Sequence, residues 1–393
     1  MLIADIPKRE KLVSHAREVS AVLAGNAAWS EENRTLHDGS VEALAEAGVF
    51  RLRAPKRYGG YEADSRTLVA VAAELAAGDA AAAWIASVYW IPTWMAGQFP
   101  DEVQDEVFST PDVRICGTLS PSAMATKVDG GVRVTGQWSF MSGARHAHWQ
   151  EIVAIQVGPG AEPMPIVALV PLSELTIVDD WFTSGLRGSG SVSTVAQDVF
   201  VPAERVLPLG AIIQGEGVSV ANANTGMYRA PLLPVASASS VGTAVGLART
   251  ALAQFLDRLP GRKITYTDYT EQSAAPLTHL QVAEAAMAID EAGFHADRLA
   301  GLLDAKCESG SAWSLAERVQ ARADLGAVCR RAKEAVDILA TASGGSSIYS
   351  QVPLQRIARD IQAINLHALM HPDTNAELHG RQLCGLPPNT QYL

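Results

Sequence analysis

A histidine near the end of the chain has a spacing that suits acid–base chemistry. His367 follows an Arg359-Asp360 pair by seven residues, in a helix-rich last third of the sequence. A histidine can deprotonate a phenol-like or indole-like nucleophile near neutral pH, or donate a hydrogen bond to it. His371 and His379 follow on what we expect to be the same helix, so the choice of His367 depends on its spacing from the pair. The alternative is a structural histidine at the end of a helix, whose ring nitrogens form hydrogen bonds and take no part in chemistry.

A second candidate is a hydroxyl at the end of a strand-like run. Ser142 lies in Gly-Gln-Trp-Ser-Phe-Met-Ser-Gly, residues 136–143. A serine hydroxyl both donates and accepts hydrogen bonds, which suits it to a polar ligand atom. Read alone, Ser142-Gly143 is more typical of a turn that merely ends a strand, since both residues are common in turns.

Two histidines in the middle of the chain suggest a competing metal site. His146 and His148, with Glu151 nearby, could bind Fe(II) or Zn(II) as cupin-like barrels do. Their spacing is shorter than the usual cupin arrangement, and no later histidine falls in the β-rich region. We therefore keep a metal-dependent barrel enzyme as a distant alternative and predict no metal site.

Hydrophobic periodicity divides the chain into three parts and predicts an α+β fold. Residues 1–112 are expected to form a helical domain with one long helix over 65–98 that Asp64 caps. Residues 113–224 are expected to form a β-barrel domain, with a hairpin at Asp129-Gly130-Gly131 before a strand at 132–140. Further strands are expected at 151–157, 164–171 and 191–201. Residues 225–393 are expected to form a four-helix bundle, with an alanine-rich seam from Val282 to Leu303.

Composition narrows the class of protein. The chain has 393 residues, 48% of them hydrophobic, and a net charge of −11, which argues against partners such as nucleic acid or an anionic membrane surface. It has no apolar run near the ~20 residues that span a bilayer and no signal-peptide pattern at its start. Its four cysteines fit neither a zinc site nor a CxxC motif, so we expect a reduced, cytoplasmic protein. Gly185-Leu-Arg-Gly-Ser-Gly190 does not match GxGxxG and has no βαβ context, so no nicotinamide site is expected.

Three segments together resemble the acyl-CoA dehydrogenases over about residues 15 to 385. They are 136–143, 185–202 with its Asp198-Val-Phe-Val-Pro202 ending, and 341–367. Acyl-CoA dehydrogenases of the common pattern carry Tyr-Glu where this chain has His367-Ala368, and that glutamate is their base. This departure resembles the flavin-dependent two-component monooxygenases (group D, oxygenase component), which use the same fold to activate oxygen.

The resemblance implies a reaction and its partners. Reduced FMN or FAD would come from a separate NAD(P)H:flavin reductase, with O2 as co-substrate. An aromatic or polyketide-like small molecule would be hydroxylated through a C4a-hydroperoxide. Ser142 would lie beside flavin N5, and His367 would act on the substrate. The alternatives are a dehydrogenase of the same fold, an N-oxygenase of an amino sugar, and a flavin-binding protein without catalysis.

The resemblance also assigns binding residues and an assembly. Trp138 and Phe140 would wall the isoalloxazine, although their expected shared strand face suits the barrel core equally well. Arg262 would reach a flavin phosphate, commonly across a subunit interface of a homotetramer. The polar break at Ser343, Gly344 and Gly345 would lie near the flavin tail. Relatives carry His-x-Trp where this chain has Pro92-Thr93-Trp94, so Trp94 and Trp90, or Tyr89, are expected at the substrate.

Overall fold

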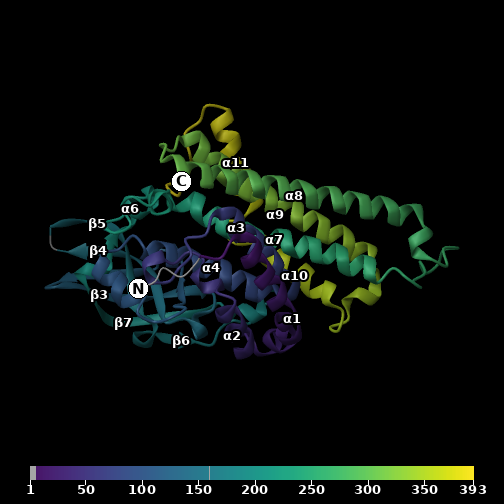
Figure 1. Ribbon diagram of the computed structural model, residues 1–393, viewed down its shortest axis with the longest axis horizontal. Helices are drawn as coiled ribbons and strands as arrows, with labels where there is room; N and C mark the ends of the chain where they lie inside the picture. Colours follow the sequence, from purple (N-terminus) through teal and green to yellow (C-terminus); the bar gives the residue numbers. More distant parts are fainter. Residues whose placement is uncertain (1–5, 159) are drawn as a thin grey trace.

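Helices, a sheet and a helical bundle follow one another along the chain, as expected (Figure 1). The computed structural model describes residues 6–158 and 160–393. The N-terminal helices are α1 (Arg9–Asn33), α2 (Asp38–Glu46), α3 (Ser65–Gly78), α4 (Ala80–Ala96) and α5 (Asp101–Val107). No helix among the described residues combines the length and apolar character that crossing a membrane requires.

The helix expected over 65–98 is two helices that meet at Asp79. Asp64 caps α3 as predicted, its side chain accepting from the backbone N–H of Thr67. Asp79 has extended backbone angles, ends α3, and caps α4 by accepting from the N–H of Ala81. An aspartate at this place satisfies orphan N–H groups of the second helix, which continuous apolar character in the sequence does not reveal.

The β-domain, expected as a barrel, is hydrogen-bonded as one eight-stranded mixed sheet whose path ends at β6 and β8. The path is β6-β7-β3-β2-β4-β5-β8, with β1 paired to β4. The strands are β1 (Ile115–Gly117), β2 (Ala123–Val128), β3 (Gly131–Met141), β4 (Trp149–Gly158), β5 (Ala161–Pro171), β6 (Thr176–Val178), β7 (Val192–Pro202) and β8 (Val206–Pro208). The hairpin at Gly130 joins β2 to β3 as predicted.

A bulge near the end of β3 changes which side chains share a face. Trp138 pairs with Thr194 and Met141 with Val192, so β3 has one more residue than β7 between the two pairs. Phe140 takes up the extra residue with a φ of 65°. Trp138 is consequently buried and Phe140 is exposed. The expectation that these two rings share one strand face was therefore wrong.

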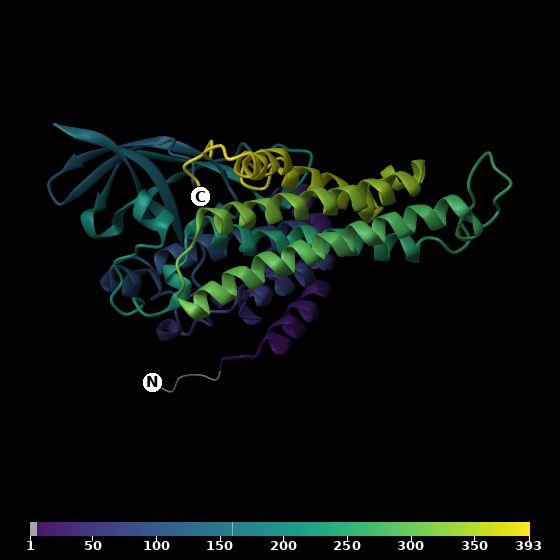
Figure 2. The same cartoon turned by 90° about the horizontal axis from the view of Figure 1, so that it is seen from above.

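The C-terminal bundle consists of α7 (Leu232–Asp257), α8 (Pro276–Ser309), α9 (Leu315–Ala342) and α10 (Pro353–Asn365). A short α6 (Leu209–Gln214) precedes it, and α11 (Pro372–Leu383) packs on α9. The long helices run side by side away from the sheet (Figure 2). The predicted seam of α8 is confirmed from Ala285 onward, while Val282 at its start is only partly buried. The buried members are Ala285, Ile289, Ala292, Ala296, Leu299 and Leu303.

Two glycines bring the bundle close to the N-terminal helices. A Cβ added to Gly242 of α7 would meet the carbonyl oxygen of Val69 at 2.5 Å, and one added to Gly246 would meet that of Ala73 at 2.4 Å. Both carbonyls belong to α3, so only glycine permits this distance between the helices. The contact fixes α3, and α4 beside it, against the bundle.

Candidate functional site

Trp84 contacts both residues that the sequence predicted for chemistry, Ser142 and His367. Its indole Nε1–H donates to the Ser142 hydroxyl at 3.1 Å, and its ring lies edge-on to the His367 imidazole with centroids 5.3 Å apart. The three residues come from α4, from the end of β3 and from the turn after α10. The structure thus brings Ser142 and His367 to one indole, although 225 positions separate them in the numbering.

Tyr89 of α4, the helix that also carries Trp84, holds the turn that follows β3. The Tyr89 hydroxyl donates to the carbonyl oxygen of Gly143 at 2.5 Å. Gly143 has a φ of 72°, and a Cβ added there would meet the Tyr89 oxygen at 2.4 Å. Glycine is needed for both reasons. Burial also raises the pKa of Tyr89 well above its ordinary value, which keeps its hydroxyl protonated and able to donate.

A chain of serine hydroxyls continues from Ser142 into the protein. Ser142 Oγ lies 2.7 Å from Ser191 Oγ, and Ser191 Oγ lies 2.7 Å from Ser189 Oγ. Ser189 Oγ is in turn 2.7 Å from the carbonyl oxygen of Leu186. All three serines are buried.

The Arg359-Asp360 pair fixes the loop that carries Ser189 and Ser191. The backbone N–H of Leu186 donates to Asp360 Oδ1 at 2.6 Å, and Arg359 donates to the carbonyl oxygen of Ser184 at 2.5 Å. A Cβ added to Gly185 would meet the carbonyl oxygen of Arg359 at 2.2 Å, so the loop lies directly against α10. The motif that singled out His367 in the sequence therefore also positions the loop beside Ser142.

Asp360 and Asp79 are buried acids in this region. The pKa of Asp360 is raised to about 7, mainly by burial; the hydrogen bond from the Leu186 N–H opposes the shift and the charge of Asp79 contributes to it. Burial likewise raises the pKa of Asp79 to about 6, while Arg356 opposes the shift. Asp79 Oδ2 has no hydrogen-bond partner. A carboxylate buried with an incomplete set of partners takes up a proton more readily, which accounts for both shifts.

His367 lies in the turn between α10 and α11, so His371 and His379 are not on its helix, contrary to expectation. The N–H of Leu369 lies 3.3 Å from its Nδ1, which makes Nδ1 an acceptor and leaves the proton of the neutral ring on Nε2. Desolvation by the surrounding protein lowers the pKa of His367 to about 4. The side chain is nevertheless exposed by surface area, so water moderates this shift. The imidazole is uncharged at neutral pH.

The two expected flavin walls have different surroundings. Phe140 is 69% exposed and packs edge-on against Trp181. Trp138 is fully buried, and its Nε1–H donates to the carbonyl oxygen of Val153 at 2.9 Å. Phe140 thus offers an open aromatic face two residues from Ser142, as a planar cofactor would need, whereas Trp138 fills the core of the sheet.

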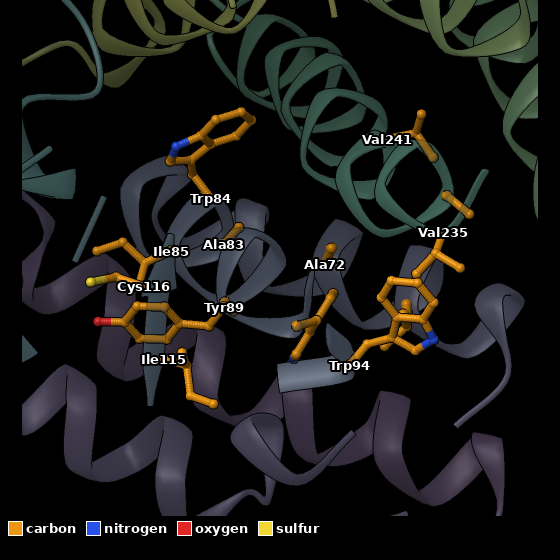
Figure 3. Close-up of a cluster of buried hydrophobic side chains, with 14 of the residues drawn as sticks. Ala72, Ala83, Trp84, Ile85, Tyr89, Trp94, Ile115, Cys116, Val235 and Val241 are labelled. Atoms are coloured by element: carbon orange, nitrogen blue, oxygen red, sulfur yellow. The ribbon is translucent and has the colours of Figure 1, made fainter. Parts of the chain in front are cut away.

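The expected substrate residues lie within the N-terminal core. Trp90 and Trp94 have no exposed surface, and their indoles donate to the carbonyl oxygens of Val49 and Met227. Figure 3 shows Trp84 and Trp94 projecting from different sides of α4, with Trp94 beside Val235 of α7. The sequence reasoning passed over Trp84. Its sequence signal was its place on the same helix as Trp94, nearly three turns earlier.

The expected phosphate contacts form a second, separate group. Arg262 donates to the carbonyl oxygen of Ser343 at 2.5 Å, next to exposed Gly344 and Gly345. This group precedes α10 and His367 follows it, so the 13 residues of α10 separate them, a length of about 20 Å at 1.5 Å per residue. Arg262 and His367 therefore lie at opposite ends of α10.

The two histidines of the alternative metal site, His146 and His148, form hydrogen bonds with other residues. His146 Nε2 lies 3.0 Å from the Thr35 hydroxyl, and His148 Nδ1 accepts from the backbone N–H of Arg114 at 3.1 Å. The part of the chain that the structure describes has no group of three or more histidine, cysteine or acidic side chains that could share a metal ion.

Known proteins resemble the chain over nearly its full length. The family model described as acyl-CoA dehydrogenase, N-terminal domain, matches residues 8–108, and the C-terminal domain model matches 238–372. The FADH(2)-dependent resorcinol hydroxylase, oxygenase component, of Rhizobium sp. (strain MTP-10005) is 32% identical, with 97% of this chain and 96% of that protein covered. The flavin-dependent monooxygenase, oxygenase subunit HsaA, of Rhodococcus jostii (strain RHA1) is 30% identical over 91% and 94%. The structure of XiaF from Streptomyces sp. in complex with FADH2 and glycerol superposes with a TM-score of 0.91, 29% identity and 98% coverage of each chain.

Fold and family models together define a protein of the acyl-CoA dehydrogenase fold. The chain belongs to the flavin-dependent monooxygenases, as an oxygenase component of the two-component kind.

Proposed function

We propose that the chain binds FADH2 delivered by a separate flavin reductase and uses O2 to hydroxylate a phenol-like aromatic molecule. When bound, the reduced flavin supplies the electrons that activate oxygen. The choice of FAD over FMN rests on the FADH2 named for the resorcinol hydroxylase and for XiaF. The choice of a phenol rests on relatives named for resorcinol and p-hydroxyphenylacetate.

The meeting of a hydroxyl and an uncharged imidazole at Trp84 is the observation that carries the proposal. His367 would donate its Nε2–H to the oxygen of a bound phenolate, which stabilises the negative charge there and keeps the ring carbons nucleophilic. Ser142 would offer its hydroxyl to the flavin beside Phe140. Trp84 would close the space between them and limit the access of water.

The assembly that fits the proposal is a homotetramer. Leu280, Met287 and Phe294 are exposed on α8 at intervals of seven residues, so they share one face of that helix. An exposed apolar stripe of this kind supports burial against a second copy of the chain. In such an assembly Arg262 would serve the flavin of a neighbouring subunit, which accounts for its distance from His367.

The test is turnover with a generic NADH:flavin reductase, FAD and a panel of phenols, indoles and amines. The expected result is a hydroxylated phenol with matching O2 and NADH consumption, and no NADH oxidation when the reductase is omitted. Products from amines alone would favour the N-oxygenase. Rapid reduction of bound flavin by acyl-CoA substrates would favour the dehydrogenase. If His146→Ala loses both its activity and a metal ion that the wild type binds, the metal-dependent barrel enzyme would be favoured.

A further inference from the structure

The Ser142 hydroxyl belongs to a hydrogen-bonded chain that can run in two directions. Each serine hydroxyl has one proton and two lone pairs. The donors and acceptors along Ser142, Ser191 and Ser189 can therefore be counted from the contacts at 2.7 Å between successive oxygens. Two additional groups enter the count, namely the Trp84 Nε1–H at one end and the Leu186 carbonyl at the other.

In the inward direction Ser189 donates to Ser191, and Ser191 donates to Ser142. Ser142 Oγ then accepts from both Trp84 and Ser191, which fills its two lone pairs. Its own proton can only point toward a ligand that accepts. The Leu186 carbonyl keeps two other donors in this state, the indole of Trp181 and the N–H of Ser189, each at 3.0 Å.

In the outward direction Ser142 donates to Ser191, Ser191 to Ser189, and Ser189 to the Leu186 carbonyl. Ser142 Oγ still accepts from Trp84 and keeps one lone pair for a ligand that donates. Only hydroxyl rotations separate the two states, so no heavy atom needs to move.

We infer that these three serines form a hydroxyl relay that matches Ser142 to both redox states of the flavin. The N5 of oxidised flavin is an acceptor, and the N5–H of reduced flavin is a donor. The inward direction serves the first and the outward direction serves the second. The inference rests on the proposed function, since it takes Ser142 as the residue that faces the flavin, and it makes Ser191 and Ser189 positioning residues.

The relay predicts an effect of Ser189→Ala that depends on redox state. Without the Ser189 oxygen, the Ser191 proton has no acceptor in the outward direction, while the inward direction loses only one accepted bond. A buried donor without a partner costs more than an empty lone pair, by an amount that corresponds to about tenfold in affinity. Reduced FAD should therefore bind about tenfold more weakly, with oxidised FAD nearly unchanged. Ser191→Ala should act in the same direction.

The experiment measures the dissociation constants of oxidised and anaerobically reduced FAD for wild type, Ser189→Ala, Ser191→Ala and Ser193→Ala. Ser193 is the matched control, because it is a buried serine of β7 whose hydroxyl donates to Ser139 at 3.0 Å, outside the relay. In the flavin-free proteins, the indole N–H resonance of Trp84, assigned with Trp84→Phe, should move in the two relay variants and stay in the control.

The expected result is a higher ratio of reduced to oxidised dissociation constants in both relay variants only. An unchanged ratio in Ser189→Ala and Ser191→Ala, or an equal change in Ser193→Ala, would overturn the relay. If Ser191→Ala does not fold, Ser189→Ala decides alone, since its oxygen is one hydroxyl further from Ser142. A wild-type protein that binds neither form of FAD would refute the proposed function instead.

Discussion

At the scale of single residues, His367 combines an uncharged ring with a defined proton position. Its Nδ1 accepts from Leu369, so Nε2–H is free to donate to a substrate oxygen. His367→Ala should therefore lower coupled hydroxylation by roughly 10–100-fold, the range of a lost hydrogen bond to a charged group. Circular dichroism should report an intact fold. The control is His279→Ala, whose ring contacts the carbonyl oxygen of Ser273 in the loop between α7 and α8.

The pH dependence of the same residue follows from its environment. Because desolvation lowers the pKa of His367 to about 4, the neutral ring persists well below the ordinary histidine pKa. Wild-type activity should hold as pH falls through 6.5 and decline only at lower pH, where a proton on Nδ1 would displace the Leu369 N–H that orients the ring. The profile should lose that acidic limb in His367→Ala. A wild-type limb at the ordinary histidine pKa of about 6.5 would contradict this environment.

Ser142 should control the fate of the electrons rather than the binding of substrate. Removing its hydroxyl in Ser142→Ala takes away the group offered to the flavin and leaves the Trp84 N–H without its acceptor. We expect more hydrogen peroxide released per NADH consumed, with the KM for the phenol little changed. A variant that stays fully coupled would exclude Ser142 from the flavin site.

Sequence reasoning proposed Ser142 and His367 but passed over Trp84, which contacts both of them. Both carried a local signal, one at a strand end and one at a fixed distance from Arg359-Asp360. Trp84 carried only its place on α4, and the direction of its ring depends on where α4 begins, at Asp79. Trp90 and Trp94 lie on the same helix but turn into the core.

At the scale of elements, the sequence predicts the regular helices and strands and misses those whose conformation depends on a neighbour. The sequence predicted the long strands and the α8 seam because their side chains repeat with a regular period. It did not predict β1, β6 and β8, which have three residues each and take their conformation from a neighbouring strand. The bulge at Phe140 was equally hidden, because it depends on pairing with β7.

Asp360 gives the contact between α10 and the serine-bearing loop a pH dependence. The pKa of its carboxyl is raised to about 7 in the folded protein, above its ordinary value of about 3.9. The folded state therefore binds the extra proton between these values, so this group's contribution to stability falls as pH rises from about 4 to about 7. Above pH 7 the buried carboxylate is a constant cost.

Two substitutions separate the charge of Asp360 from its hydrogen bond. Asp360→Asn keeps an oxygen for the Leu186 N–H, so it should flatten the fall in Tm between pH 4 and 7 and be neutral or stabilising at pH 8. Asp360→Ala leaves that N–H unpaired and should cost about 1–3 kcal/mol at pH 8. Thermal melts across this range measure both. Equal Tm losses in the two variants at pH 8 would show that the charge, not the hydrogen bond, holds the loop.

At the scale of the whole molecule, the exposed face of α8 should hold subunits together. Phe294→Arg places a charge in the apolar stripe that Leu280 and Met287 continue. We expect sedimentation velocity to show smaller species than the homotetramer proposed for the wild type. Val22→Arg is the control, because Val22 is an exposed apolar residue on α1 rather than on this face. A wild-type monomer, or a tetramer unaffected by Phe294→Arg, would exclude α8 as the interface.

Arg262 tests whether the tetramer completes the flavin site. Its guanidinium lies beside exposed Gly344 and Gly345, at the opposite end of α10 from His367. Burial and the charge of Arg258 lower the pKa of Arg262, and a nearby phosphate would reduce the cost of this crowding of positive charge. Arg262→Ala should therefore weaken FAD binding roughly 10–100-fold, the range of a lost hydrogen bond to a charged group, while the tetramer survives. Lys263→Ala removes the adjacent exposed charge and should leave affinity near wild type. Unchanged FAD affinity in Arg262→Ala would remove this residue from the site.

A mixed tetramer of Arg262→Ala and Ser142→Ala subunits provides the final check. If Arg262 serves a neighbour, random mixing restores some intact sites by pairing a normal Arg262 with a normal Ser142, and coupled turnover should exceed that of either parent.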